Sequence, residues 1–257
     1  MKLLVLFTIL FANTVIAQDN RIAQFAVWQP YPGQEVNFQL GYKRHLQWRK
    51  TTRESWEWHG WQIASGPRAG QFINATFDHY WSDFDRTTSP NEDMADKLLN
   101  IVPYAELQSV YKITFLKSPL SIGTPQSLKS KSAILRMITL KVSDIGTGAQ
   151  LISRLRASYA NNSDISYLLS FKKIDGGEIN ELMLLLGFET WDLYGKSENI
   201  QEQITSIENG LKVKIIQSIR SETLVLRPDL SLFSGDENIS KSLIPSIIPP
   251  IKADGDN

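Results

Sequence analysis

The two halves of this chain repeat one order of secondary structure, and this repetition constrains the fold more than any other feature. In the first half, the hydrophobic periodicity predicts a strand, a helix, two strands joined by a turn, a helix and a strand. Their ranges are 22–29, 34–50, 56–65, 71–81, 91–105 and 110–118. The second half gives the same order over 133–143, 149–161, 165–174, 179–194, 198–219 and 222–233. This β-α-β-β-α-β order is typical of a ferredoxin-like unit.

Each such unit covers one face of its sheet with helices and leaves the other face bare. The run 182–188, LMLLLGF, is apolar on both sides of its strand, as expected of a sheet that is buried on both faces. Two bare faces in one chain are buried most simply against each other. We therefore expect an α+β protein of two tandem ferredoxin-like repeats, packed sheet-to-sheet as an intrachain α+β barrel.

The ends and the middle of the chain suggest its division. Residues 1–17 read as a cleavable signal peptide, since Lys2 precedes an apolar run too short to span a bilayer; a retained N-terminal anchor is the alternative. We expect the first repeat over 18–117, a linker rich in Ser, Pro and Gly over 118–132, and the second repeat over 133–233. A disordered tail would follow over 234–257. This predicts an exported protein, periplasmic or secreted.

Charge and cysteine content exclude several classes of protein. The 27 basic and 27 acidic residues give a net charge of zero, so the chain lacks the excess positive charge that attracts nucleic acid. We therefore expect no nucleic-acid partner and, after signal cleavage, no membrane partner. There is no cysteine for a disulfide framework or a thiol nucleophile. Gly146-Thr147-Gly148 lacks the third glycine of a dinucleotide loop, because Leu151 stands there. We expect no cofactor, and a monomer or homodimer.

At this point the element order resembles the dimeric α+β barrel superfamily in a tandem, single-chain form. Its members include the NIPSNAP proteins, antibiotic-biosynthesis monooxygenases, EthD-like proteins and chlorite dismutases. The resemblance implies oxidative chemistry on hydrophobic ligands, although no catalytic motif of these families is matched residue by residue. The stretch GYKRHLQW…WEWHGWQIASGPRAGQF…FDHYWSDFD is also similar to a group of exported, uncharacterised proteins.

All three histidines lie in the first half. A hairpin turn within Gly66–Gly70 places His59 opposite Phe77 or His79, so that the two histidines are cross-strand neighbours. Trp61, Phe77 and Trp81 would share their face. Three roles stay open for the histidine pair: packed, hydrogen-bonded residues, ligands of a metal or haem, and proton carriers in a ligand cavity. Carboxylates that would complete a metal site are Asp78, Asp83 and Asp85.

The first predicted helix carries His45 and Arg49 on the same stripe as Phe38 and Tyr42. A helix stripe that faces a sheet needs neither polar residue, and the corresponding helix of the second half has only apolar residues there. This contrast is the strongest functional signal in the sequence. Whether His45 shares a face with the other two histidines stays open.

The dense aromatic cluster of the first hairpin has two interpretations. It consists of Trp56, Trp58, Trp61, Tyr80 and Trp81, which either pack in the core or bind a sugar or a flat organic ligand. We predict ligand binding by His59, His79, Trp61, Trp81, His45 and Arg49, with no metal ligand and no assigned catalytic residue.

Three functions are compatible with these residues. The first is the binding of a small hydrophobic or aromatic ligand in a barrel cavity near the first hairpin. The second is a monooxygenase-like or haem- or metal-dependent oxidoreductase, and the third is a structural or interaction module with a filled barrel.

Overall fold

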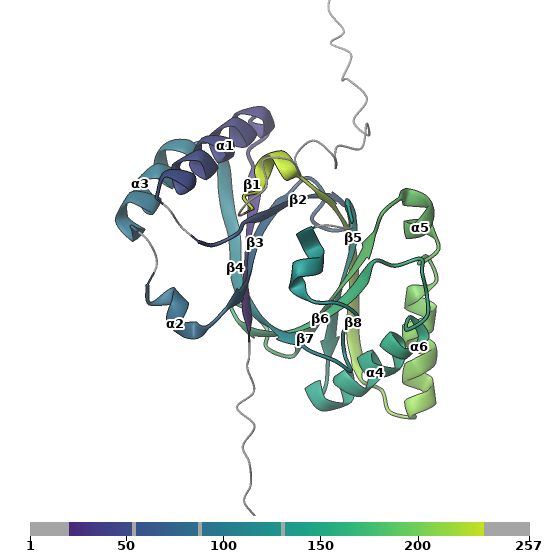
Figure 1. Cartoon of the computed structure of the whole chain (residues 1–257). Helices are drawn as coiled ribbons and strands as arrows, with labels where there is room; N and C mark the ends of the chain where they lie inside the picture. Colours follow the sequence, from purple (N-terminus) through teal and green to yellow (C-terminus); the bar gives the residue numbers. More distant parts are fainter. Residues whose placement is uncertain (1–20, 53–54, 87–88, 130–131, 234–257) are drawn as a thin grey trace, which may run out of the picture.

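The computed structural model describes residues 21–52, 55–86, 89–129 and 132–233 (Figure 1). The strands are β1 (Ile22–Pro30), β2 (His59–Ser65), β3 (Phe72–His79), β4 (Ala105–Leu116), β5 (Ile134–Val142), β6 (Tyr167–Asp175), β7 (Glu181–Phe188) and β8 (Ile216–Leu226). The helices are α1 (Glu35–Thr51), α2 (Trp81–Phe84), α3 (Pro90–Asn100), α4 (Ile145–Ser158), α5 (Trp191–Gly195) and α6 (Ile200–Leu211), with the 3-10 turns η1 (Pro125–Lys129) and η2 (Pro228–Leu230). The predicted signal peptide and tail lie outside the described residues.

Within the described residues, eight strands form one closed antiparallel barrel in the order β1-β3-β2-β8-β5-β7-β6-β4. Each half of the chain supplies four adjacent strands, β4-β1-β3-β2 and β8-β5-β7-β6. The halves join edge to edge, β2 with β8 and β4 with β6, so their inner faces enclose one interior. The fold is therefore a mixed α+β barrel, and helices α2 and α5 are short additions to the predicted order.

The interior of the barrel is filled by apolar side chains from both halves. Phe171 on β6 is fully buried and contacts the rings of Phe77 and Phe115. The segment expected as a linker contributes too, because Leu128 of η1 is 1% exposed within this core. Figure 1 shows η1 as a short teal helix inside the ring of strands. The centre of the barrel is thus packed with side chains from both halves and from η1.

The outer face of the second half is covered in the ordinary way. Helices α4 and α6 press Leu151, Leu155, Ile200 and Ile204 onto β5 and β7, and all four side chains are buried. Asp144 caps α4 by accepting a hydrogen bond from the backbone N–H of Thr147. This half contains a second, purely apolar core.

The outer face of the first half is covered unequally. Helix α1 buries Phe38 and Tyr42 against Phe72 of β3, as its apolar stripe predicts. Helix α3 has no buried residue. Met94 and Leu98 are 56% and 55% exposed, whereas Ile101 and Ala105, just after the helix, are buried. Helix α3 turns its charged side toward α1.

Candidate functional site

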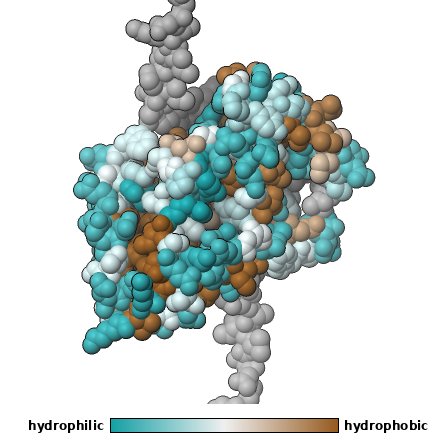
Figure 2. Space-filling view, turned by 180° about the vertical axis from the view of Figure 1, so that it is seen from behind, coloured by the Kyte–Doolittle hydropathy of each residue, from teal (hydrophilic) through white to brown (hydrophobic). Residues whose placement is uncertain are grey.

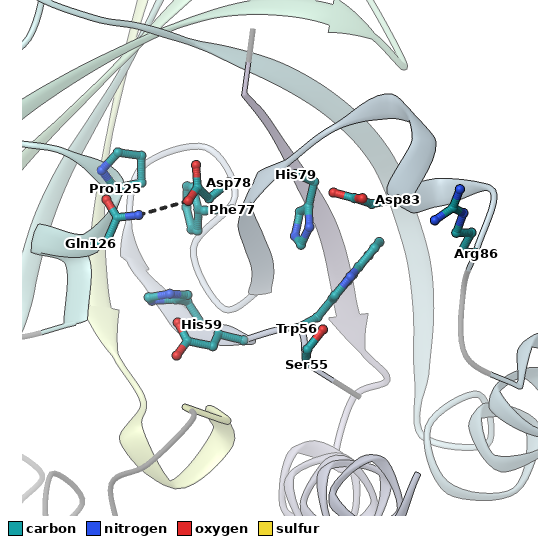
Figure 3. Close-up of a pocket in the computed structure, with 11 residues that line it drawn as sticks. Ser55, Trp56, His59, Phe77, Asp78, His79, Asp83, Arg86, Pro125 and Gln126 are labelled. Carbon is teal, nitrogen blue, oxygen red and sulfur yellow. Dashed lines mark hydrogen bonds between the residues drawn. The ribbon is translucent and has the colours of Figure 1, made fainter. Parts of the chain in front are cut away.

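A pocket of about 470 Å³ lies at one end of the barrel, where β3 ends and β2 begins. Its walls come from the start of β2, the end of β3, helix α2 and the turn η1 (Figure 3). The side chains that line it include Trp56, His59, Phe77, Asp78, His79, Asp83, Arg86 and Gln126. We call it the mouth pocket. It brings together two of the three histidines, but by a different geometry from the one predicted.

The hairpin register differs from the prediction. His59 pairs with Ala75 and not with Phe77 or His79. The hairpin closes with two backbone hydrogen bonds, Ile63 N–H to Gln71 O and Gly70 N–H to Ile63 O, so its loop is centred earlier than the expected turn. Because strand pairing follows the centre of the loop, every partner shifts along β3.

A bulge at the end of β3 separates the two histidines further. Asp78 has a positive φ of 70°, and the register with β1 shifts between Thr76 and His79. His79 thereby lies on the side of Thr76, with 2.5 Å between His79 Nε2 and Thr76 Oγ1, while Phe77 packs against the barrel core. The two histidines are not cross-strand neighbours. They approach the mouth pocket from different walls.

His59 forms the inner wall of the pocket and is 2% exposed. Its imidazole is stacked on Trp61 with 5.5 Å between ring centroids, and it meets Phe77 and Phe233 edge-on at 5.2 and 4.8 Å. These rings hold the imidazole in one orientation.

His79 forms the outer wall. Its ring lies 4.0 Å from that of Trp56, centroid to centroid, and is also close to Phe84. Burial lowers the pKa of His79 below its ordinary value, and Arg21 acts in the same direction, although Asp83 and Asp78 oppose them. The imidazole is therefore neutral near pH 7 and able both to donate and to accept a hydrogen bond.

The rim of the mouth pocket is polar. Gln126 donates to the carboxylate of Asp78 at 3.1 Å, and Arg21 donates to the backbone carbonyl of the same residue at 3.1 Å. Asp83 accepts a hydrogen bond from the backbone N–H of Tyr80 at 2.7 Å. These contacts fix Asp78 in a backbone conformation that costs energy for a residue other than glycine. Gln126 comes from the predicted linker, and no sequence signal marked it.

Trp61 and Trp81, which we predicted to bind the ligand, do not line the mouth pocket. Trp61 is 1% exposed inside the barrel core, behind His59. Trp81 is 53% exposed at the start of α2 and does not line the mouth pocket. Trp56, which the sequence assigned only to the aromatic cluster, lies at the pocket instead.

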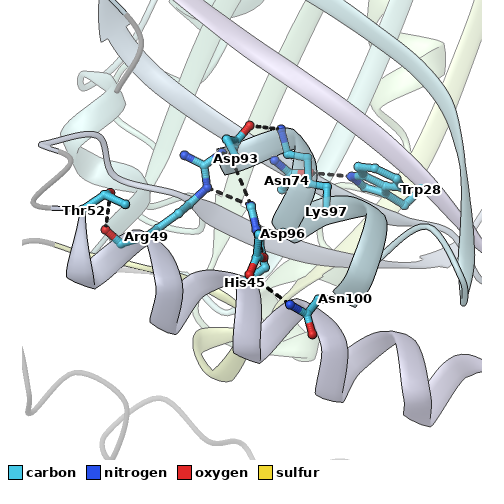
Figure 4. A network of polar contacts seen from close by, with 9 residues as sticks. All are labelled: Trp28, His45, Arg49, Thr52, Asn74, Asp93, Asp96, Lys97 and Asn100. Carbon is cyan, nitrogen blue, oxygen red and sulfur yellow. Dashed lines mark hydrogen bonds and ion pairs between the residues drawn. The ribbon is translucent and has the colours of Figure 1, made fainter. Parts of the chain in front are cut away.

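His45 and Arg49 are buried on α1, on the packed stripe where the sequence places them. They belong to a polar network between α1 and α3 that is separate from the mouth pocket (Figure 4). His45 Nε2 accepts a hydrogen bond from Arg49 Nε at 2.9 Å, so Nδ1 carries the proton and donates to Asp96 Oδ2 at 2.7 Å. Arg49 Nη2 donates to Asp93 Oδ1 at 2.6 Å, and Lys97 pairs with the same carboxylate.

Sequence reasoning missed Asp93 and Asp96, although one signal pointed to them. A buried arginine and histidine on α1 need acidic partners, and α3 is the neighbouring helix with carboxylates three residues apart. The network neutralises its own charges, which accounts for the polar stripe of α1 without a ligand.

The pH dependence of stability should report on His45. Burial, followed by the Arg49 charge, lowers the pKa of His45 to about 4, whereas an unfolded histidine titrates near 6.5. Between these values the unfolded chain binds a proton that the folded protein does not, so stability is lost as the pH falls. We expect a loss of about 2 kcal/mol between pH 7 and pH 5.

Urea unfolding at both pH values measures this loss, with His45→Gln as the matched variant. Glutamine cannot titrate, so its stability should change by about 2 kcal/mol less over the same interval. Equal pH dependence in both proteins would show that His45 titrates normally in the folded state.

The donor atoms of the described residues do not form a clustered metal site. Within the described part of the chain, no group of three or more His, Cys, Asp or Glu side chains is placed to hold a metal ion. His79 Nε2 is engaged by Thr76, and His59 packs against three aromatic rings. The predicted completion of a metal site by Asp78, Asp83 and Asp85 is therefore not seen in the described residues.

Comparisons with known proteins give the fold. No family model matches the sequence, and no curated protein does. Among solved structures, a monooxygenase candidate from Lactobacillus acidophilus superposes with a TM-score of 0.54 at 15% identity, covering 84% of this chain and 97% of its own. An anthrone oxidase-like protein gives 0.56 at 9% identity over 86% and 95%. A chlorite dismutase candidate gives 0.54 at 10% identity over 82% and 96%.

The chain therefore shares a mixed α+β barrel fold with these neighbours. At such low identity the likeness concerns the fold alone. The resemblance to NIPSNAP proteins and to the exported group stays a prediction. In the described residues no helix has the length and hydrophobicity needed to cross a bilayer.

Proposed function

We propose that this protein binds a small, flat aromatic molecule with hydrogen-bonding groups in the mouth pocket. One observation carries the proposal: two histidines on opposite walls converge, with Trp56 and Phe77, on a space of about 470 Å³. Ligand pockets of proteins combine apolar walls with a few convergent polar groups in this way, and their volumes start near 300 Å³. A filled barrel with a purely structural role needs no such arrangement.

Each lining residue has a role in this proposal. Trp56 and Phe77 supply apolar walls for a ring, and the neutral imidazole of His79 exchanges a hydrogen bond with a hydroxyl or carbonyl group. Arg86 and Gln126 stand at the rim, where a second polar substituent would lie. His45 and Arg49 are assigned to the α1–α3 network and not to this ligand.

The proposal also includes the finer features of the architecture. The two halves are tandem ferredoxin-like repeats, and the mouth pocket is built mainly by the first of them. The chain is exported after cleavage near residue 17, and it meets its ligand in the periplasm or outside the cell. Support for export comes from the N-terminal sequence only.

Calorimetric titration with 1-naphthol, a flat phenol, tests the proposal. We expect measurable binding, weakened about tenfold by His79→Gln and by His59→Gln, because each loses a contact of about 1.4 kcal/mol. Trp191→Phe is the control, since Trp191 is an exposed aromatic residue of the second half. Binding that is absent, or equal in all four proteins, would remove the mouth pocket as the site.

A second candidate function is oxidation of the bound ligand by molecular oxygen. The observation that favours it is the neutral, buried His79, which is able to accept a proton from an acidic C–H or phenol. The names of the structural neighbours suggest anthrone as a probe. Anthrone and O₂ would yield anthraquinone and water, with oxygen uptake lost in His79→Gln. If only the background oxidation of anthrone in buffer is seen, the protein is a binder and not an oxidase.

A further inference from the structure

A second hollow lies on the outer face of the first half, about 320 Å³ in volume, between the sheet and helices α1 and α3. It shares no lining residue with the mouth pocket. In the second half the same space is filled, since α6 inserts Ile200 and Ile204 onto the sheet. We call the hollow the α3 groove. The question is why the first half has a hollow at a position that is filled in the second half.

The cause of the groove is the orientation of α3. Asp93 and Asp96 are engaged by Arg49 and His45 of α1, which holds the helix by its charged side. The apolar side chains of α3 and the chain after it therefore stand at the rim, with Met94 56% and Val102 40% exposed. Figure 2 shows apolar side chains gathered at the surface of the molecule. Large groups of exposed apolar side chains beside a hollow are typical of binding surfaces.

Asn74, at the floor of the groove, is the observation that points to a ligand. It lies on β3, is 6% exposed and lines the groove. Trp28 Nε1 donates to its Oδ1 at 2.9 Å, which fixes the orientation of the amide (Figure 4). Among the hydrogen bonds of the described residues, none is donated by Nδ2 of Asn74. A ligand oxygen that accepts a hydrogen bond from this Nδ2 gains about 0.5 to 1.5 kcal/mol net.

The charges around the groove exclude an ionic ligand. Arg49 and Lys97 both line it, but the Asp93 carboxylate pairs with both of them. The remaining surface is mainly aromatic and aliphatic, from Trp28, Tyr42, Ile101, Leu107 and Val110. A neutral molecule leaves these ion pairs intact and covers the apolar walls.

We propose that the α3 groove is a second small-molecule site, which takes a neutral, largely apolar ring compound with one acceptor oxygen. Nδ2 of Asn74 donates to that oxygen, and Trp28 holds the amide in the donating orientation. The hydrocarbon part lies against Ile101, Leu107 and Val110. This site goes beyond the function proposed above and uses none of its residues.

A matched pair of probes isolates the hydrogen bond. The compounds 2-acetylnaphthalene and 2-ethylnaphthalene have nearly the same shape, but only the ketone offers an acceptor. We expect the ketone to bind about tenfold more tightly to the unmodified chain, and Asn74→Leu to reduce its affinity to that of the hydrocarbon. Equal affinity of the two compounds for the unmodified chain would overturn the proposal.

Two further measurements test the proposal if Asn74→Leu does not fold. They also show whether the ketone binds at another place on the protein. Val110→Trp, at a position 40% exposed on the rim, should fold and block the ketone. His45 lines the groove and His79 does not, so the ketone should shift the imidazole NMR signal of His45 only. Unchanged binding to Val110→Trp, or a shift of His79 instead, would overturn the groove and leave the mouth pocket in place.

The groove could also be covered by a second copy of the chain. In that case sedimentation would show a dimer that Val110→Trp dissociates, and the proposal of a small-molecule site would be wrong. We expect one sedimenting species of unchanged mass in both proteins.

Discussion

Replacing Phe171 by alanine is expected to lower the free energy of unfolding by about 3 to 5 kcal/mol. Phe171 has no exposed surface, and its ring is 5.5 Å from that of Phe115 and 6.2 Å from that of Phe77, centroid to centroid. Alanine would leave a cavity between strands of both halves, which the closed barrel cannot collapse to fill. Urea unfolding followed by tryptophan fluorescence measures the loss.

Tyr31→Ala is the control for this substitution. Tyr31 is 40% exposed, so removal of its ring should cost about 0.5 kcal/mol. If the two halves share one interior, Phe171→Ala should keep a single unfolding transition at a lower urea concentration. Two separate transitions, with only the second-half transition shifted, would show that the halves have independent cores.

Replacing Arg49 by methionine is expected to destabilise the protein by about 3 kcal/mol. Methionine keeps the length of the side chain, but it leaves Nε2 of His45 without its hydrogen-bond donor and the Asp93 carboxylate with Lys97 as its remaining partner. The guanidinium also lies 4.2 Å from the ring centroid of Trp58, and this cation–π contact is lost. Thermal or urea unfolding at pH 7 gives the magnitude.

Arg44→Met is the control on the same helix, because Arg44 is exposed and donates to Asn100 at the surface. It should cost less than about 1 kcal/mol. The double variant Arg49→Met with Asp93→Leu should be less destabilised than the sum of its single variants, since neither charge is then left alone. Additive losses, or equal effects of Arg44→Met and Arg49→Met, would show that the α1–α3 network does not hold the helix.

The sequence predicts the order of the elements well, because periodicity depends on neighbouring residues only. The succession of the main helices and strands along the chain and the polar stripe of α1 follow from it. The same local information does not show that α3 leaves its apolar residues Met94 and Leu98 exposed. The partners of its acidic residues are on α1, about fifty residues away in the chain, and periodicity cannot report such pairs.

The sequence predicted some of the residues that line the candidate site, but not how they are arranged in space. His59 and His79 do line one pocket, but a hairpin loop centred earlier than expected and the bulge at Asp78 place them on different walls. A one-residue irregularity reverses the side of a strand on which a side chain lies, and no composition rule locates it. Gln126 and Leu128 were unpredictable because they belong to a segment with the composition of a linker.

The most direct test of the account is the imidazole NMR spectrum of the protein, which contains three histidines. Each signal is assigned by one glutamine variant and followed during titration with 1-naphthol. The account predicts that the signals of His59 and His79 shift together, with one saturation curve, while any shift of His45, which lines the α3 groove, follows a separate curve. A shift of His45 without the other two, or no shift at all, would contradict the assignment of the ligand to the mouth of the barrel.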